Sequence, residues 1–360
     1  MRGMILMRYI GLRFLRNTVG VYLACAALVF LVESIENLRR ASAHDVGLDT
    51  VFLLAFLRLP MLSEQIIPFA VLIGAIFTYL MLSRSLELAV TRAAGFSVWQ
   101  FILPALVVSV GIGLFTTTVF NPVAANFSER YQQIYLDVFG VEEYKAMQFP
   151  VWIRQTSVDG PAVIHAGDHA RAGQKLQDVT VYIFDPANKF QERIEARSAE
   201  LEPGRWQLTQ VEVFRPDQPA QQFNAYYLST YLTPAQLKLL TTTAETVSFW
   251  DLPETIEINE KAGLSTDKLV FQYQNLIARP LLMCAMVIIA ATVSLRVFRS
   301  GNIGRMIISG IVAGFVFYVV LKIMGDLGAA GVIRPSLSVW GPVVVALLLG
   351  TNVLLFQEDG

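Results

Sequence analysis

Six long apolar runs most constrain what this chain of 360 residues can fold into. A helix needs about 20 mostly apolar residues to cross roughly 30 Å of hydrocarbon, at about 1.5 Å per residue. Only 16% of the residues are charged, against about 25% in soluble proteins. We therefore predict six membrane-spanning helices, from the runs 18–35, 51–82, 98–120, 268–295, 306–324 and 337–356.

The first run raises the alternative of a cleavable signal peptide, because Arg2, Arg8, Arg13 and Arg16 precede it. A signal peptide has an apolar core of about 7–15 residues and a cleavage site of the small-x-small type. The run is longer than such a core, and no such site closes it. We therefore expect a retained first span.

The stretch 121–266 is polar and holds most of the Asp, Glu, Gln and Lys residues. Its first part, 121–140, is expected to continue the third span as a helix beyond the bilayer. Short alternating runs follow, separated by turn pairs such as Asp159-Gly160 and Pro203-Gly204, which predicts a meander of antiparallel strands. A β-sandwich, a jelly roll or an open roll would suit such strands.

The predicted fold class is a membrane α-helical protein with an inserted all-β domain. Six transmembrane helices are expected, with a sandwich, jelly-roll or open-roll β domain between the third and the fourth. The predicted domains are 1–120, 121–266 and 267–360.

Arginine in the short connections predicts the orientation, because positively charged loops stay in the cytoplasm. One side of the membrane would hold Arg2, Arg8, Arg13, Arg16, Arg84, Arg92, Arg296, Arg299 and Arg305. The short loops of the other side hold Arg39, Arg40 and Arg334, with Lys322 near the end of a span. We expect both termini in the cytoplasm and the β domain outside, which is the periplasm if the cell is Gram-negative.

A short amphipathic stretch, 83–97, lies between the second and third apolar runs. Ser85 can cap the start of a helix and Gly95 can end it, which predicts a cytoplasmic helix over 84–96. Glu87 and Arg92 project from its apolar body. The helix could be a solvated turn whose charges face water or lipid headgroups.

Alternatively, the helix could dock a nucleotide-binding subunit, as cytoplasmic helices of many ABC permeases do, with Glu87 in a groove of the ATPase. The chain has no Gly-x-x-x-x-Gly-Lys-Ser/Thr loop, so ATP hydrolysis would have to come from a partner. We expect this chain to bind no cofactor itself, and ATP with Mg²⁺ to be used by the partner ATPase.

Several short motifs follow one another in the order typical of one family. They are Arg-Tyr-Ile-Gly at 8–11, Leu-Glu-Leu at 86–88, Arg-Ala-Ala-Gly-Phe-Ser at 92–97, Val-Trp-Ile-Arg at 151–154 and Gly-Phe-Val-Phe-Tyr at 314–318. With them the chain resembles the LptF/LptG family of lipopolysaccharide export permeases over essentially its whole length. Its ending, with Trp-Gly-Pro at 340–342, is more similar to the LptG branch than to the LptF branch.

The resemblance implies a transport subunit that is not an enzyme. It implies the permease part of an ABC transporter that extracts lipopolysaccharide from the inner membrane and passes it to a periplasmic bridge. The implied partners are an LptF-like subunit in a heterodimer, an LptB-like ATPase dimer, an LptC-like single-span protein and an LptA-like bridge, with no nucleic acid. The coupling role falls on Glu87, with Arg92 and Gly95 in the same motif.

Charged residues in the first two spans are candidates for contact with the lipid. Arg39 and Arg40, at the outer end of the first span, could hold phosphate or could reach ordinary lipid headgroups. Glu33 stands near a place where the family tends to carry a basic residue. Arg58 and Glu64 are six apart and need not pair with each other, so each is expected to face the cavity or a subunit contact.

Two later spans also carry charges. In the fourth run Arg279 precedes Pro280. In the fifth, Lys322 and Asp326 are four apart, a spacing that allows them to pair on one helix face.

Apolar residues on the expected inner face of the β domain have two possible roles. A closed sandwich would bury Trp152, Ile164, Ile183, Trp206 and Leu208 against one another. A jelly roll left open along one seam would offer them to acyl chains as a groove. The resemblance favours the groove.

Two other function classes stay open: an integral-membrane enzyme that modifies lipids, and a membrane scaffold with a periplasmic β domain. His165 and His169 are four apart, but they lie across Gly167-Asp168 in a predicted strand-turn region with no Glu between them, unlike a zinc helix. No Gly-x-Ser-x-Gly elbow occurs either. We expect no metal site and no catalytic residue. A scaffold would not need charges within its spans together with a capped cytoplasmic helix.

Overall fold

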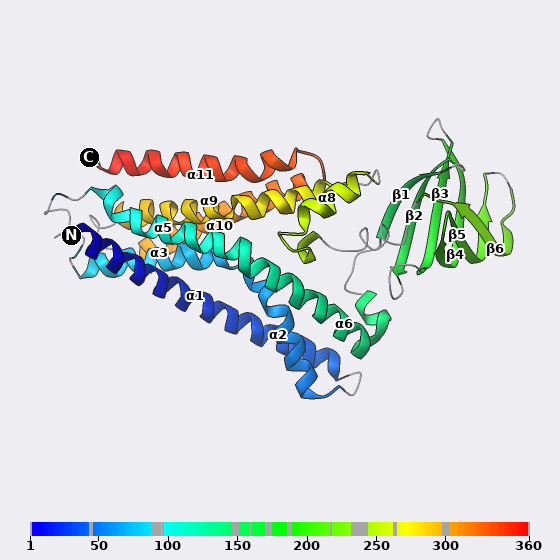
Figure 1. The fold of residues 1–360 in the computed structure, drawn as a ribbon, viewed down its shortest axis with the longest axis horizontal. Coiled ribbons are helices and arrows are strands. Elements are labelled where there is room, and N and C mark those ends of the chain that lie inside the picture. Colours follow the sequence, from blue (N-terminus) through cyan, green and yellow to red (C-terminus); the bar gives the residue numbers. More distant parts are fainter. Residues whose placement is uncertain are drawn as a thin grey trace. The chain divides into compact units, whose positions relative to one another are not determined.

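The structure is a computed structural model in which most of the chain is described (Figure 1). It forms two compact units, which we call the membrane unit (Met1–Tyr131, Ala244–Ile256 and Ser265–Gly360) and the β unit (residues 132–243 and 257–264). The described residues are 2–42, 46–85, 87, 95, 97–145, 151–157, 160–169, 175–185, 189–216, 218–231, 244–261, 265–296 and 303–358.

Long helices build the membrane unit. They are α1 (Arg2–Ala41), α2 (Leu48–Glu64), α3 (Ile67–Arg84), α5 (Val98–Phe115), α9 (Asp267–Arg296), α10 (Ile303–Ala329) and α11 (Pro335–Glu358). A π-helical turn, Thr116–Phe120, joins α5 to α6 (Asn121–Lys145), so the third span continues as a helix, as predicted. The short helices Ala244–Thr246 and α8 (Leu252–Lys261) precede α9. Within the described chain, six helices are long and apolar enough to cross a membrane, which confirms the predicted number.

The second apolar run forms two helices rather than one. The helix α2 ends at Glu64. The next helix, α3, starts at Ile67 and has Pro68 in its first turn. Proline has no N–H group to give to a preceding turn, so it is tolerated where a helix begins. Of these two helices, α3 is the one that can span a membrane.

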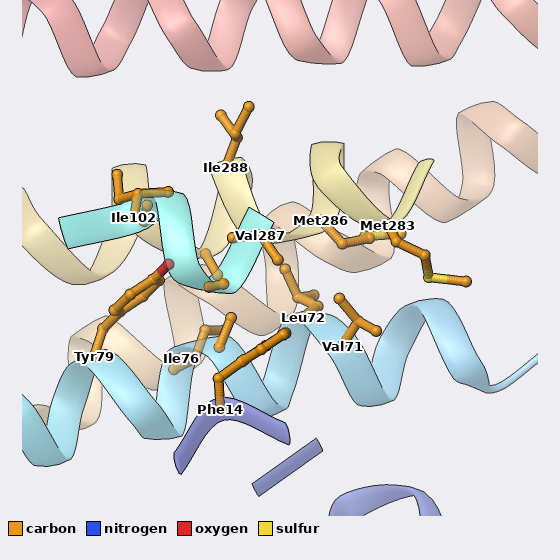
Figure 2. Packing of buried hydrophobic residues seen from close by; sticks show 14 of the residues in the cluster. Phe14, Val71, Leu72, Ile76, Tyr79, Ile102, Met283, Met286, Val287 and Ile288 are labelled. Atoms are coloured by element: carbon orange, nitrogen blue, oxygen red, sulfur yellow. The ribbon is translucent and has the colours of Figure 1, made fainter. Parts of the chain in front are cut away.

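The core of the membrane unit lies between α1, α3, α5 and α9 (Figure 2). In Figure 2 Phe14 points from α1 towards α3, and Met283 and Met286 lie between α9 and α3. Of the six candidate spans α9 is the most buried, whereas α1 and α10 are the least buried. The core is therefore built around α3 and α9, and α1 and α10 expose most of their apolar side chains.

Glycine allows two pairs of helices to approach closely. A Cβ atom added at Gly74 of α3 would lie 2.7 Å from the Cα atom of Thr18 in α1. One added at Gly113 of α5 would lie 2.4 Å from the Cα atom of Pro280 in α9. Helix pairs in membranes associate through such small residues, because packing has to replace the hydrophobic effect.

In the part of the β unit that the structure describes, six strands form one antiparallel sheet, in the order β1 to β6. Each strand pairs with the next one along the chain, so the predicted meander is confirmed, as is the fold class of six membrane helices with an inserted all-β region. The strands are β1 (Val151–Ser157), β2 (Gly160–His169), β3 (Lys175–Phe184), β4 (Phe190–Glu202), β5 (Arg205–Phe214) and β6 (Gln221–Ser229).

The close approach of α5 and α9 gives a stability prediction. Gly113→Ala should lower the free energy of unfolding by about 1–3 kcal/mol, because the backbones must separate to accept the methyl group. Thermal unfolding of the purified chain in detergent measures this. Gly111→Ala is the matched control, since a Cβ atom at Gly111 meets nothing within 4 Å. Equal unfolding temperatures for the two variants would contradict the tight contact.

Candidate functional site

The predicted cytoplasmic helix, 84–96, follows α3 in the chain. Ser85 is the C-cap residue of α3, and its hydroxyl donates to the carbonyl oxygen of Met81 at 3.0 Å. Most of 84–96, including Arg92, lies outside the described residues. Gly95 is described and has a φ of +86°, a left-handed conformation that glycine adopts without strain.

Glu87 lies next to the N-terminal part of α1. Its Oε1 atom is 3.4 Å from the Arg13 guanidinium and 3.4 Å from the Tyr9 hydroxyl. Arg13 also donates to the Tyr9 hydroxyl at 2.6 Å. The Glu87 side chain is 38% exposed, so the carboxylate touches α1 and still reaches solvent.

At the C-terminal end of α1, both predicted phosphate ligands are paired with an acidic residue of their own helix. Arg39 and Arg40 bind Glu36 at 2.7 and 2.8 Å. The Arg39 side chain is 72% exposed, whereas that of Arg40 is 15% exposed. Sequence reasoning missed Glu36, although its spacing of three and four residues from the two arginines was a usable signal.

Glu33 forms an ion pair with Arg58 of α2 at 2.6 Å. The Arg58 guanidinium also lies 5.5 Å from the centre of the Tyr131 ring, a cation–π distance. An acidic residue at position 33 thus neutralises a cation from the neighbouring helix. The two candidates from α1 and α2 are brought together, although they were predicted separately.

Glu64 forms a buried ion pair with Arg279 of α9. Their side chains are 8% and 11% exposed. Asn121, at the start of α6, donates to Glu64 at 3.1 Å and accepts the backbone N–H of Phe249 at 2.9 Å. Glu64 therefore joins α2, α6 and α9, and it does not pair with Arg58.

The remaining charged pair in the described spans was predicted. Lys322 and Asp326 of α10 form an ion pair at 3.1 Å, with side chains 64% and 65% exposed. Their spacing on one helix face was sufficient to find them.

Apolar residues of the β unit gather on one face of the sheet. Ile164, Ile183, Trp206 and Leu208 are buried there in one cluster, and the side chain of Trp152 lies outside the described atoms. The cluster also contains Val181 and Val211.

The sheet is strongly curled. Gln155 of β1 accepts hydrogen bonds from Trp206 of β5 at 3.2 Å and from Thr230, just after β6, at 2.7 Å. Four strand spacings separate β1 from β5, which is about 19 Å in a flat sheet. Contact between these strands requires the sheet to bend around its apolar face, so the face becomes the interior of a roll.

Comparison with known proteins finds a family that matches nearly the whole chain. Residues 8–356 match the family described as "Lipopolysaccharide export system permease LptF/LptG".

The chain belongs to the LptF/LptG family.

Two relatives are similar over nearly their full lengths. The lipopolysaccharide export system permease protein LptG of Escherichia coli K12 is 22% identical over 361 residues, covering 98% of this chain and 96% of the relative. LptG of Haemophilus influenzae is 22% identical over 349 residues, covering 95% and 94%. The sequence-based family assignment is confirmed. The chain is a lipopolysaccharide export permease, and its six apolar helices are consistent with a multi-pass inner-membrane protein.

The buried pair between Glu64 and Arg279 gives a test of its contribution to folding. Arg279→Met should destabilise the chain by about 3–5 kcal/mol, because it leaves a buried carboxylate without its cation. The double variant Glu64→Leu/Arg279→Met should recover much of that loss. Thermal unfolding of the purified chain measures both.

Lys322→Met is the matched control, since it breaks an ion pair that is exposed. Its cost should stay below about 1 kcal/mol. Additive losses in the double variant would mean that Glu64 and Arg279 do not compensate each other.

Proposed function

We propose that this chain is the LptG-like permease subunit of an ABC transporter that moves lipopolysaccharide out of the inner membrane. ATP with Mg²⁺ would be hydrolysed by an LptB-like dimer at the cytoplasmic side, where both termini and the 84–96 segment would lie. The observation that carries the proposal is Glu87. It is a carboxylate just after the end of α3, partly exposed and in contact with α1, in a chain without a P-loop.

A second permease subunit would complete the transmembrane path. Large apolar side chains are exposed along both α1 and α10, for example Leu28 and Leu31 of α1 and Phe315 and Val316 of α10. Such surfaces suit lipid or neighbouring helices. In our proposal an LptF-like subunit and the single helix of an LptC-like protein lie beside them, and the lipid enters between the subunits.

The charged residues of α1 and α2 divide into two groups in this proposal. Arg39 is largely exposed and Arg40 shares its carboxylate partner, Glu36, so phosphate of the lipid can compete with Glu36 for both. Glu33, Arg58 and Glu64 are packed into ion pairs between helices, which suits residues that hold the cavity walls together.

The roll of the β unit would receive the acyl chains. Its interior is lined by aliphatic and aromatic side chains, including Ile164, Ile183, Trp206 and Leu208, and needs no catalytic group. In the proposal this periplasmic unit passes the lipid on towards an LptA-like bridge, with Trp152 and its strand β1 at one edge of the sheet.

Purification of the tagged chain in detergent tests the partnership. An ATPase and a second six-span protein should co-purify. Glu87→Ala should lower recovery of the ATPase or lipid transport by about tenfold, because a charge-assisted contact worth about 1.5–3 kcal/mol is lost. Normal membrane insertion of the variant is the control. Wild-type protein that brings down neither partner would refute the proposal.

A photo-crosslinking residue in β5 tests the route of the acyl chains. Placed at Leu208, on the inner face, it should label lipopolysaccharide in an ATP-dependent way. Placed at Gln210, which is exposed on the same strand, it should label far less. Labelling of protein alone from position 208 would indicate a closed core, and a circular-dichroism spectrum of each variant would exclude unfolding.

A further inference from the structure

Arg13 differs from the other arginines near the start of α1. Arg8 and Arg16 are exposed, as expected of residues that favour a cytoplasmic loop. The Arg13 side chain is 18% exposed and lies on the helix face that carries Ile10 and Phe14, both fully buried. Arg13 therefore faces the protein, and its position needs another explanation than orientation in the membrane.

The surroundings of Arg13 provide one carboxylate among the described residues. Its guanidinium donates to Tyr9 at 2.6 Å and to Glu87 at 3.4 Å, and it lies 5.7 Å from the centre of the Tyr9 ring. Its Nε atom is buried and has no hydrogen-bond partner in the described part of the chain. A guanidinium withdrawn from water is costly unless an anion compensates it, so Glu87 is the compensating charge.

Glu87 can keep this contact while it meets a second basic group. An ionised carboxylate has about four acceptor positions, and more than one-third of the Glu87 side chain is exposed. Docking against an ATPase and pairing with α1 are thus compatible. The same side chain can take force from outside the chain and pass it to α1.

The route from Glu87 to α1 is direct because α1 and α3 are packed together. Thr18 of α1 lies against Gly74 of α3, and Asn17 donates to the Thr78 hydroxyl at 2.9 Å. Further along α1, Glu33 binds Arg58 of α2. α1 thus has a polar contact near each end and a close backbone contact between them.

We propose that Arg13 is a positioning residue for Glu87: it holds the carboxylate against α1, so that displacement of Glu87 moves α1. Tyr9 assists by bonding both side chains. The inference rests on the proposed coupling role of Glu87. It adds the group within this chain that receives the displacement.

The positioning role of Arg13 can be tested in the complex of this chain with the ATPase and the second permease subunit. Arg13→Met should leave ATPase recovery near normal and lower the lipid exported per ATP by about fivefold or more, because one charge-assisted contact is lost. Arg13→Lys should keep most of the coupling. Arg16→Met is the matched control, with the same loss of charge from an exposed site on the same helix, and should export normally.

A double variant separates a role through Glu87 from a general loss of structure. Arg13→Met/Glu87→Gln should be no worse than Glu87→Gln alone, because Arg13 acts through that carboxylate. Multiplied losses in the double variant, or an equal loss in Arg16→Met, would overturn the proposal.

The contact itself can be tested without the ATPase. In a chain that carries Cys25→Ala and Cys284→Ala, a short bismaleimide should join the thiols of Arg13→Cys/Glu87→Cys, and those of Arg16→Cys/Glu87→Cys much less. No preference between the pairs would refute the contact. If wild-type chain recovers no ATPase while the 13–87 pair still crosslinks, the proposed function fails and the contact stands.

Discussion

Pairing of charges between helices is the interaction on which the membrane unit depends. An ionised side chain in the centre of a bilayer costs roughly 2.5–3.5 kcal/mol or more, so it must meet its counter-ion inside the protein. Glu64 with Arg279 and Glu33 with Arg58 satisfy this condition across different helices. Each pair therefore specifies which helices are neighbours, in a solvent that gives no hydrophobic preference for one apolar surface over another.

In the β unit one face of the sheet stays apolar although the sheet bends. Buried residues in β3, β4 and β5 are spaced by three positions instead of two at Leu176 and Val179, Ala196 and Ala199, and Leu208 and Val211. Asp178 and Gln210 lie in these gaps with left-handed φ angles of 47° and 52°. The strand register skips both residues, and it skips Arg197 of β4 at the same level, so the irregular positions of the three strands lie in one row across the sheet.

Sequence alone predicted features that depend on local spacing. Six apolar runs, the strand order and the pair of Lys322 with Asp326 all follow from length, turn chemistry or a separation of four residues. The partner of Glu64 could not be found this way, because Arg279 is 215 residues away and comes near Glu64 only when the chain is folded. Glu36 was a local signal that was missed, and it changes how Arg39 and Arg40 must be understood.

The contacts of α1 differ in how easily they can change. Gly74 and Thr18 touch through backbone atoms, and no side-chain rotation can release that contact. The pair of Arg13 with Glu87 is held by long side chains, and more than one-third of the Glu87 side chain is exposed, so this pair can exchange a charged partner at modest cost. The pair of Glu33 with Arg58 is mostly buried, and breaking it would leave a charge without its counter-ion. The N-terminal end of α1 is therefore the end at which this helix can change partners without opening the apolar core between α3 and α9.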